Sequence, residues 1–188
     1  MSLSRRSRLT LPLIALAVIA LTLPSIGQTK YRGRYFTEND GKSDPVLTIN
    51  IEILGYSTAD EILGIIKAYS DQGEAGFHAA FRALKKGSLR VTGGRGMNIE
   101  FHAARATPTD KGQRIELIAE NARLELGAAQ TPYSGLMFMV VILDVDAKGR
   151  GEAKIYEDAT CRFVDGQLVL DEFKRAPKFI TGLTQLKK

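Results

Sequence analysis

The residues best suited to chemistry are few in this chain of 188 residues. The two histidines, His78 and His102, each fall on the polar side of a predicted element. Neither has a second histidine, a cysteine or a carboxylate at the spacing of metal ligands, so we interpret both as solvated or locally hydrogen-bonded. The single cysteine, Cys161, alternates with Ala159 and Phe163, which predicts a small buried side chain rather than a reactive thiol.

The acidic sequence Asp144-Val145-Asp146-Ala147-Lys148-Gly149 begins like a calcium-binding loop. However, Lys148 stands where the third oxygen ligand is needed, and Ile155 stands where the bidentate glutamate is needed. We therefore predict a hairpin turn and no metal. The glycine-rich segment Gly93-Gly94-Arg95-Gly96 is not followed by a helix that could face a phosphate group, so no nucleotide or other cofactor is expected.

No motif in the sequence defines a reaction, and no catalytic residue is predicted. Strand alternation nevertheless places two charged residues among apolar ones: Glu157 on the side of Ile155, and Arg105 on the side of Phe101. Because a buried carboxylate needs a partner, three outcomes are open. A bulge turns Glu157 outward, or Glu157 lies at a wet rim of the sheet, or it pairs with Arg105 inside a pocket. These two residues are the candidate ligand-binding residues.

The elements that position these residues follow a predicted export signal. Three arginines precede an apolar segment, Leu9–Leu23, and Ser25-Ile26-Gly27 supplies the small residues that a signal peptidase reads. The segment is short for a membrane span of about 20 residues. We therefore interpret residues 1–27 as a cleaved signal peptide, with a retained anchor as the alternative. This interpretation predicts an exported protein, periplasmic or extracellular, without a membrane span after cleavage.

Removal of the signal changes the charge of the chain. Subtracting its three arginines from 26 basic residues leaves 23, against 21 acidic ones, so the net charge is +2. This value gives no reason to expect a nucleic-acid partner. Residues 28–45 form a polar N-terminal arm, in which Tyr31, Tyr35 and Phe36 form either a short first strand or an ordered arm. Residues 46–188 are enough for one domain with one core.

The central predicted element is the strand Leu136–Asp146, which starts with eight consecutive apolar residues and is expected to be buried on both faces. Val46–Leu54 alternates apolar and polar residues, as a half-buried strand does. From Ser88 to Phe173 the chain shows the same alternation, interrupted by turns. The residues after Phe173 give no clear element type.

Two short helices are predicted between the first strands. Thr58 and Glu61 form a capping box, Gly73 suits the position after the last turn, and a second helix ends near Lys86. The predicted fold is α+β: a curved, mostly antiparallel β-sheet or partly open barrel with a two-helix hairpin packed on it. The predicted core side chains are Ile51, Ile66, Phe81, Met139, Val141, Leu143, Ile155 and Phe163.

Four segments quoted from the sequence carry a family resemblance. They are Ser57-Thr58-Ala59-Asp60-Glu61, Ala104-Arg105-Ala106-Thr107-Pro108, Gly112-Gln113-Arg114-Ile115-Glu116-Leu117, and the eleven residues from Asp144 to Lys154. Over residues 46–173 the chain resembles a family of uncharacterised exported bacterial proteins. The resemblance implies export and a single domain, and it implies no activity, ligand or site.

Two classes of function fit these observations. The first is an exported, non-enzymatic module that binds a small apolar molecule or a partner protein in the groove between sheet and helices. The second is a hydrolase-type enzyme whose carboxylates come together only in the fold. A purely structural protein of the cell envelope is a third possibility. The scarcity of convergent titratable groups favours the binding module.

Overall fold

The structure, a computed structural model, describes residues 28–36, 46–92, 97–120, 137–164, 167–173 and 176–187. The predicted signal segment and Gly93–Gly96 lie outside the described residues, and so do the side chains of Cys161 and Phe163.

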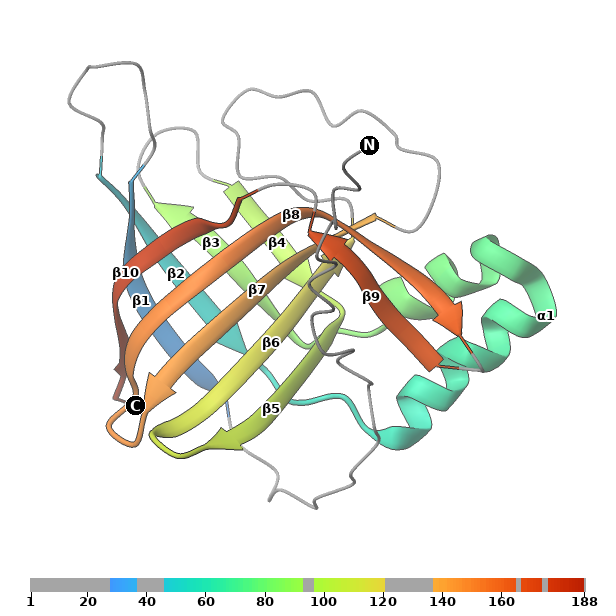
Figure 1. The fold of residues 1–188 in the computed structure, drawn as a ribbon, viewed down its shortest axis with the longest axis horizontal. Coiled ribbons are helices and arrows are strands. Elements are labelled where there is room, and N and C mark those ends of the chain that lie inside the picture. Colours follow the sequence, from blue (N-terminus) through green and yellow to red (C-terminus); the bar gives the residue numbers. More distant parts are fainter. Residues whose placement is uncertain are drawn as a thin grey trace, which may run out of the picture.

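In these ranges ten strands form one antiparallel sheet (Figure 1). Nine of them follow the order β4-β3-β2-β1-β10-β8-β7-β6-β5, and β9 pairs with β8 outside this path. The strands are β1 (Thr29–Phe36), β2 (Val46–Ile53), β3 (Gly87–Thr92), β4 (Met97–Phe101), β5 (Ala103–Thr109), β6 (Gly112–Glu120), β7 (Met137–Asp146), β8 (Arg150–Val164), β9 (Gln167–Phe173) and β10 (Lys178–Leu186).

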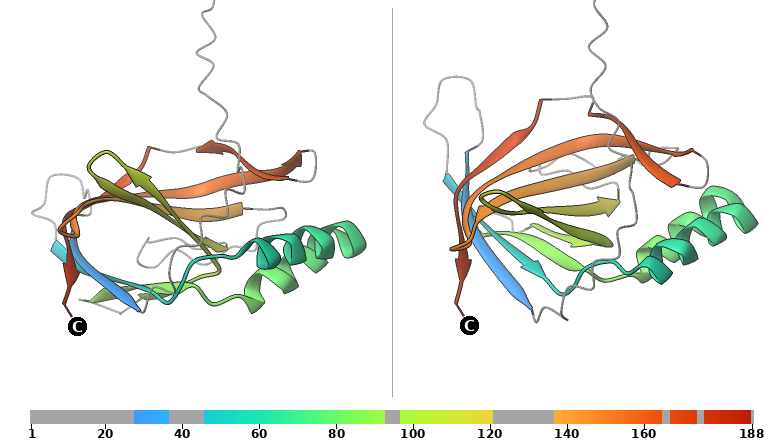
Figure 2. Two further views of the ribbon diagram at one scale, coloured as in Figure 1. Left: turned by 90° about the horizontal axis from the view of Figure 1, so that it is seen from below. Right: turned by 60° about the horizontal axis from the view of Figure 1, so that its bottom comes forward.

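The two ends of this path are consecutive in the chain, so the sheet curls into a nearly closed antiparallel barrel (Figure 2). Only His102 separates β4, which pairs with β3, from β5, which pairs with β6. The bend is held by backbone hydrogen bonds from His102 N to Ile118 O (2.9 Å) and from Lys86 N to Phe101 O (2.8 Å). The α+β class and the antiparallel sheet are therefore confirmed.

Strand β7 is central, as its apolar run predicts. It pairs with β6 along one edge and with β8 along the other. Met139, Val141 and Leu143 point into the barrel and are fully buried, while Phe138 is buried on the outer face. The end of β7 leads into the predicted hairpin turn, in which the carboxylate of Asp146, the last residue of the strand, accepts hydrogen bonds from the backbone N–H groups of Lys148 and Arg150 (2.8 Å each).

The prediction of a two-helix hairpin is wrong. One helix, α1 (Ala59–Ala83), follows β2, and its capping box is present. Gly73 has a positive φ of 64°, as its sequence position suggests, but it produces a kink inside one helical element. Helical turns continue directly on both sides of Gly73, so one kinked helix stands in place of the predicted two helices and their connecting loop.

Helix α1 packs on the outside of the barrel, beside the seam between β4 and β6 (Figures 1 and 2). Its buried residues Ile65, Phe77 and Phe81 meet Ala103 and Phe138 of the sheet. Ile66, which the sequence predicts to be in the core, is only half-buried, because it lies at the edge of the apolar stripe centred on Ile65. No helix in the described residues is both long and apolar enough to cross a membrane.

The first and last described strands complete the barrel. Strand β1 lies between β2 and β10. Of the two alternatives predicted for Tyr31 and Tyr35, a short strand or an ordered arm, the structure therefore shows the strand. Both rings are buried in the same core as Ile51 and Ile155. Strand β10, which the sequence left without an element type, joins β1 to β8.

Candidate ligand-binding site at one end of the barrel

The structure gives the two predicted site residues different partners. Glu157 is buried, with 3% of its surface exposed, and its carboxylate pairs with the Lys178 ammonium at 2.8 Å. Arg105 pairs instead with Glu116 of the neighbouring strand at 2.6 Å. The pairing of β7 with β8 does shift register between Tyr156 and Ala159, as a bulge would, but this irregularity leaves Glu157 buried and does not turn it outward. The pair with Arg105 does not occur.

The Glu157–Lys178 pair explains how a carboxylate is accommodated in the barrel. Lys178 lies opposite Ile155 on the adjacent strand, which brings its ammonium within reach of a carboxylate two residues further along. Both groups have additional interactions. A buried ion pair contributes little net stability, because desolvation offsets the attraction of the charges, but removal of one partner is costly. This pair therefore keeps a buried charge satisfied.

A second polar cluster lies at the other end of the interior, where β1 begins and β2 ends. We call Tyr31, Tyr56 and Gln113 the tyrosine cluster. Tyr31 is fully buried, and none of the described residues forms a hydrogen bond with its hydroxyl group. Gln113 shares the inward parity of Ile115 on β6. Tyr56 belongs to the β2–α1 connection, is half-buried and packs against the barrel core.

Both phenols of the tyrosine cluster are neutral over the physiological range. Burial raises the pKa of Tyr31, and the nearby Gln113 amide partly offsets this effect, although its geometry does not make a hydrogen bond to the hydroxyl. Burial, and then the proximity of Tyr31, raise the pKa of Tyr56 to about 12. The cluster therefore presents uncharged hydroxyl groups that can donate or accept hydrogen bonds.

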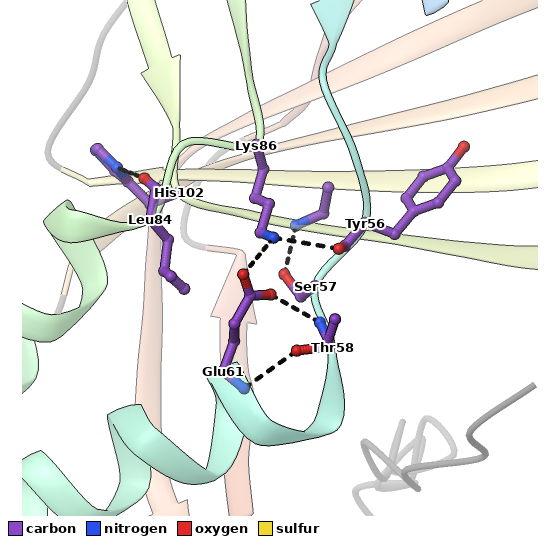
Figure 3. A network of polar contacts seen from close by, with 8 residues as sticks. Tyr56, Ser57, Thr58, Glu61, Leu84, Lys86 and His102 are labelled. Carbon is purple, nitrogen blue, oxygen red and sulfur yellow. Dashed lines mark hydrogen bonds and ion pairs between the residues drawn. The ribbon is translucent and has the colours of Figure 1, made fainter. Parts of the chain in front are cut away.

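The backbone that carries Tyr56 is held by a buried lysine (Figure 3). The Lys86 ammonium donates to the Tyr56 carbonyl oxygen at 3.2 Å and pairs with the Glu61 carboxylate at 2.7 Å. Glu61 also accepts from the backbone N–H of Thr58 (2.8 Å), which completes the capping box. Figure 3 shows the Tyr56 ring pointing away from this network, so the lysine fixes the backbone and not the ring.

The same network fastens both ends of α1 to the seam of the barrel. Ser57 N donates to Ala104 O (2.8 Å), and Ser57 Oγ accepts from Ala104 N (3.1 Å). At the other end of the helix, Nδ1 of His102 lies 2.8 Å from the carbonyl oxygen of Leu84, the C-cap residue. The contact between His102 and Leu84 appears in Figure 3. The predicted local bonding of His102 is thus observed.

A third cluster joins the helix to β6. The buried Glu120 carboxylate contacts Nδ1 of His78 and binds the Arg82 guanidinium through both of its oxygens, at 2.5 and 2.9 Å. A carboxylate beside a histidine is also found in general-base catalysis, but here it is shared with an arginine in the manner of a structural salt bridge. In the described part of the chain no three histidine, cysteine or acidic residues gather as a metal site would require.

Sequence reasoning missed the tyrosine cluster, although one signal was available. Gln113 is polar yet shares the strand parity of Ile115 and Leu117, just as Glu157 shares that of Ile155. Such a polar residue on an apolar face marks a possible site. Comparison of the chain with models of known families, with curated proteins and with solved structures finds no match.

Proposed function

We propose that the protein is an exported, non-enzymatic binding module that takes a small, mostly apolar molecule at the tyrosine cluster. The observation that supports the proposal is the fully buried Tyr31 hydroxyl, to which no described residue is hydrogen-bonded. A buried hydroxyl without a partner costs about 1–3 kcal/mol. Proteins rarely keep such a group unless water or a ligand satisfies it.

The chemistry of the cluster favours a neutral ligand with a hydrogen-bond acceptor. Two neutral phenols and one amide supply donors, and the surrounding side chains are apolar. The nearby Lys86 ammonium is already engaged by Glu61 and by a backbone carbonyl. An anionic group would therefore meet no free cation from this network, whereas a ketone, ester or ether oxygen needs none. The rest of the ligand would contact apolar surface at the barrel end.

Access to Tyr31 would pass the Tyr56 side chain. Tyr56 is half-exposed, and its backbone is anchored independently by Lys86. Rotation of the ring alone could therefore expose Tyr31 without movement of the helix. We place the site here rather than in the groove between sheet and helix because packed aromatic rings fill that interface. There Phe77 lies 5.4 Å from Phe81 and 5.8 Å from Phe138, measured between ring centroids.

The proposal is tested with prodan, a neutral naphthalene with a ketone acceptor, and with 2-dimethylaminonaphthalene, which lacks the ketone. We expect prodan to bind the wild-type protein more tightly than the analogue. Tyr31→Phe should weaken prodan binding about two- to twelvefold, the value of one hydrogen bond, and leave the analogue unchanged. Equal affinity of both probes for both proteins would show that the hydroxyl serves no ligand, for example because water satisfies it.

The other parts of the proposal have their own tests. Export rests on the N-terminal sequence pattern, and it predicts a mature protein whose mass lacks the first 27 residues. The hydrolase alternative from the sequence needs carboxylates that come together in the fold, and among the described residues we test it at Glu120, the carboxylate that contacts His78. It predicts ester hydrolysis that His78→Ala abolishes, whereas a binding module shows none. A partner-protein role and a purely structural role in the cell envelope are the remaining alternatives from the sequence.

A further inference from the structure

The outer face of the barrel carries a regular array of arginines on five neighbouring strands. The strands β10, β1, β2, β3 and β4 follow one another in the sheet (Figure 1). The strand pairing aligns one row across all five strands: Thr184, Arg32, Asn50, Arg90 and Asn98. A second row follows directly: Thr181, Arg34, Thr48 and Thr92. We call these two rows the arginine face.

The arginine face is positively charged because neither row contains an acid. Arg32, Arg34 and Arg90 are exposed, and none of the described carboxylates pairs with them. The nearest acids along the register, Glu52 and Glu100, occupy the adjacent row, where Glu52 pairs with a lysine. Three unneutralised arginines on one side of a protein form a patch that attracts anions.

Side chains within the array hold the central arginine in place. Nε of Arg32 donates to the Asn50 side-chain oxygen at 2.9 Å, and the Asn50 amide donates to the Thr92 hydroxyl at 3.4 Å. This contact orients the Arg32 guanidinium and leaves its two terminal amino groups available. A guanidinium held in this way can bind two oxygens of a phosphate group.

An exposed aromatic residue borders the arginines. Phe179 is 48% exposed and lies two residues from Thr181 on β10, with the same outward parity. An exposed phenyl ring beside basic side chains is typical of proteins that lie on a membrane, where the ring enters the acyl boundary and the cations meet the headgroups. A soluble polyanion without aromatic groups, such as a sulfated polysaccharide, would use the arginines but would gain little from the ring.

From this arrangement we infer that the arginine face, with Phe179 at its border, docks on an anionic phospholipid surface. The three guanidinium groups meet the headgroup phosphates, and the phenyl ring enters the boundary of the acyl chains. This surface is separate from the tyrosine cluster, which lies inside the barrel. The inference therefore does not depend on the proposed ligand.

Sedimentation with phospholipid vesicles tests this inference. The probes are vesicles of phosphatidylcholine alone and vesicles in which part of it is replaced by phosphatidylglycerol. The full mature chain should bind only the anionic vesicles, and binding should weaken as salt is added. The triple variant Arg32→Gln/Arg34→Gln/Arg90→Gln should bind about 100-fold more weakly, because each charge near the surface contributes about fivefold.

A charge-matched control separates the arginine face from net charge. The variant Lys67→Gln/Lys85→Gln/Lys111→Gln removes three exposed charges outside the five strands of the arginine face, and it should bind anionic vesicles nearly as the wild type does. The single variant Arg90→Gln, expected to bind about fivefold more weakly, provides a second test if the triple variant folds poorly. Phe179→Ser should weaken vesicle binding about tenfold but leave binding to heparin, a soluble polyanion, unchanged.

Three results would overturn the inference. The first is no preference for anionic vesicles at low salt. The second is an equal loss of binding in the arginine variant and in its charge-matched control. The third is binding to heparin without binding to vesicles, which would identify a soluble polyanion as the partner of the arginine face.

Discussion

The substitution Tyr31→Phe removes only the hydroxyl group. It therefore tests whether the buried hydroxyl lowers the stability of the free protein, separately from whether it binds a ligand. In the free protein the hydroxyl is buried and receives no hydrogen bond from the described residues. Its removal therefore breaks no internal bond and keeps the ring packed in the core. The desolvation penalty of the hydroxyl disappears at the same time. We expect the variant to be more stable than the wild type, which is unusual for a change in a fully buried residue.

The expected gain is about 1–3 kcal/mol, the cost of leaving one buried polar group unsatisfied. For a chain of this size, each kcal/mol shifts the melting temperature by about 2–4 °C. Urea unfolding followed by circular dichroism measures the free energy, and calorimetry measures the melting temperature. The midpoint should move without a change in slope, because the surface exposed on unfolding is nearly the same.

The matched control is Tyr35→Phe. Tyr35 lies on the same strand and the same face, is also buried, and has an interaction partner. We expect no gain in stability from this substitution. A loss of stability in Tyr31→Phe would refute the reasoning, because it would show that the Tyr31 hydroxyl is bonded inside the protein, with Gln113 as the nearest candidate.

Further predictions concern the ionisable groups. Burial raises the pKa of Tyr56 to about 12 from its ordinary value of 10.0, so between these pH values the folded state keeps a proton that the unfolded state loses. Stability should therefore fall over this pH range, and Tyr56→Phe should reduce the fall in alkaline unfolding curves. Glu61→Gln should lower the free energy of unfolding by about 1–3 kcal/mol, measured by urea unfolding, since it leaves the buried Lys86 ammonium without a carboxylate. Lys86→Met should lower it less, because the carboxylate that is then left alone, Glu61, is the more exposed of the two partners. Lys178→Met should lower the free energy of unfolding by about 3 kcal/mol, because it leaves the buried Glu157 carboxylate without its lysine. The double variant Lys178→Met/Glu157→Met should recover most of this loss. Equal stability of the single and double variants would contradict the coupling of the two residues.

Local sequence patterns predicted the local structure well. The apolar run of β7, the alternation of β2 and the capping box at Thr58 and Glu61 all depend on neighbouring residues, and all three are observed. The kink at Gly73 shows where local reasoning ends. A glycine with positive φ fits both a helix end and a kink, and only the packing of the following turns on the barrel decides between them.

Long-range contacts could not be read from the sequence. The partner of Glu157 is 21 residues away, on a strand whose type the sequence did not reveal. The tyrosine cluster draws on β1, the β2–α1 connection and β6, which meet only because the sheet curls into a barrel. A polar residue on an apolar strand face, such as Gln113, identifies a candidate for a site but not its neighbours.

The most direct test of a ligand site at Tyr31 is a crystal structure of the protein with prodan bound. We predict that the ketone oxygen lies within about 2.5–3.0 Å of the Tyr31 hydroxyl oxygen and that the Tyr56 ring has turned aside. Prodan bound elsewhere, or a Tyr31 hydroxyl bonded to Gln113 in the presence of the probe, would contradict a ligand site at the tyrosine cluster.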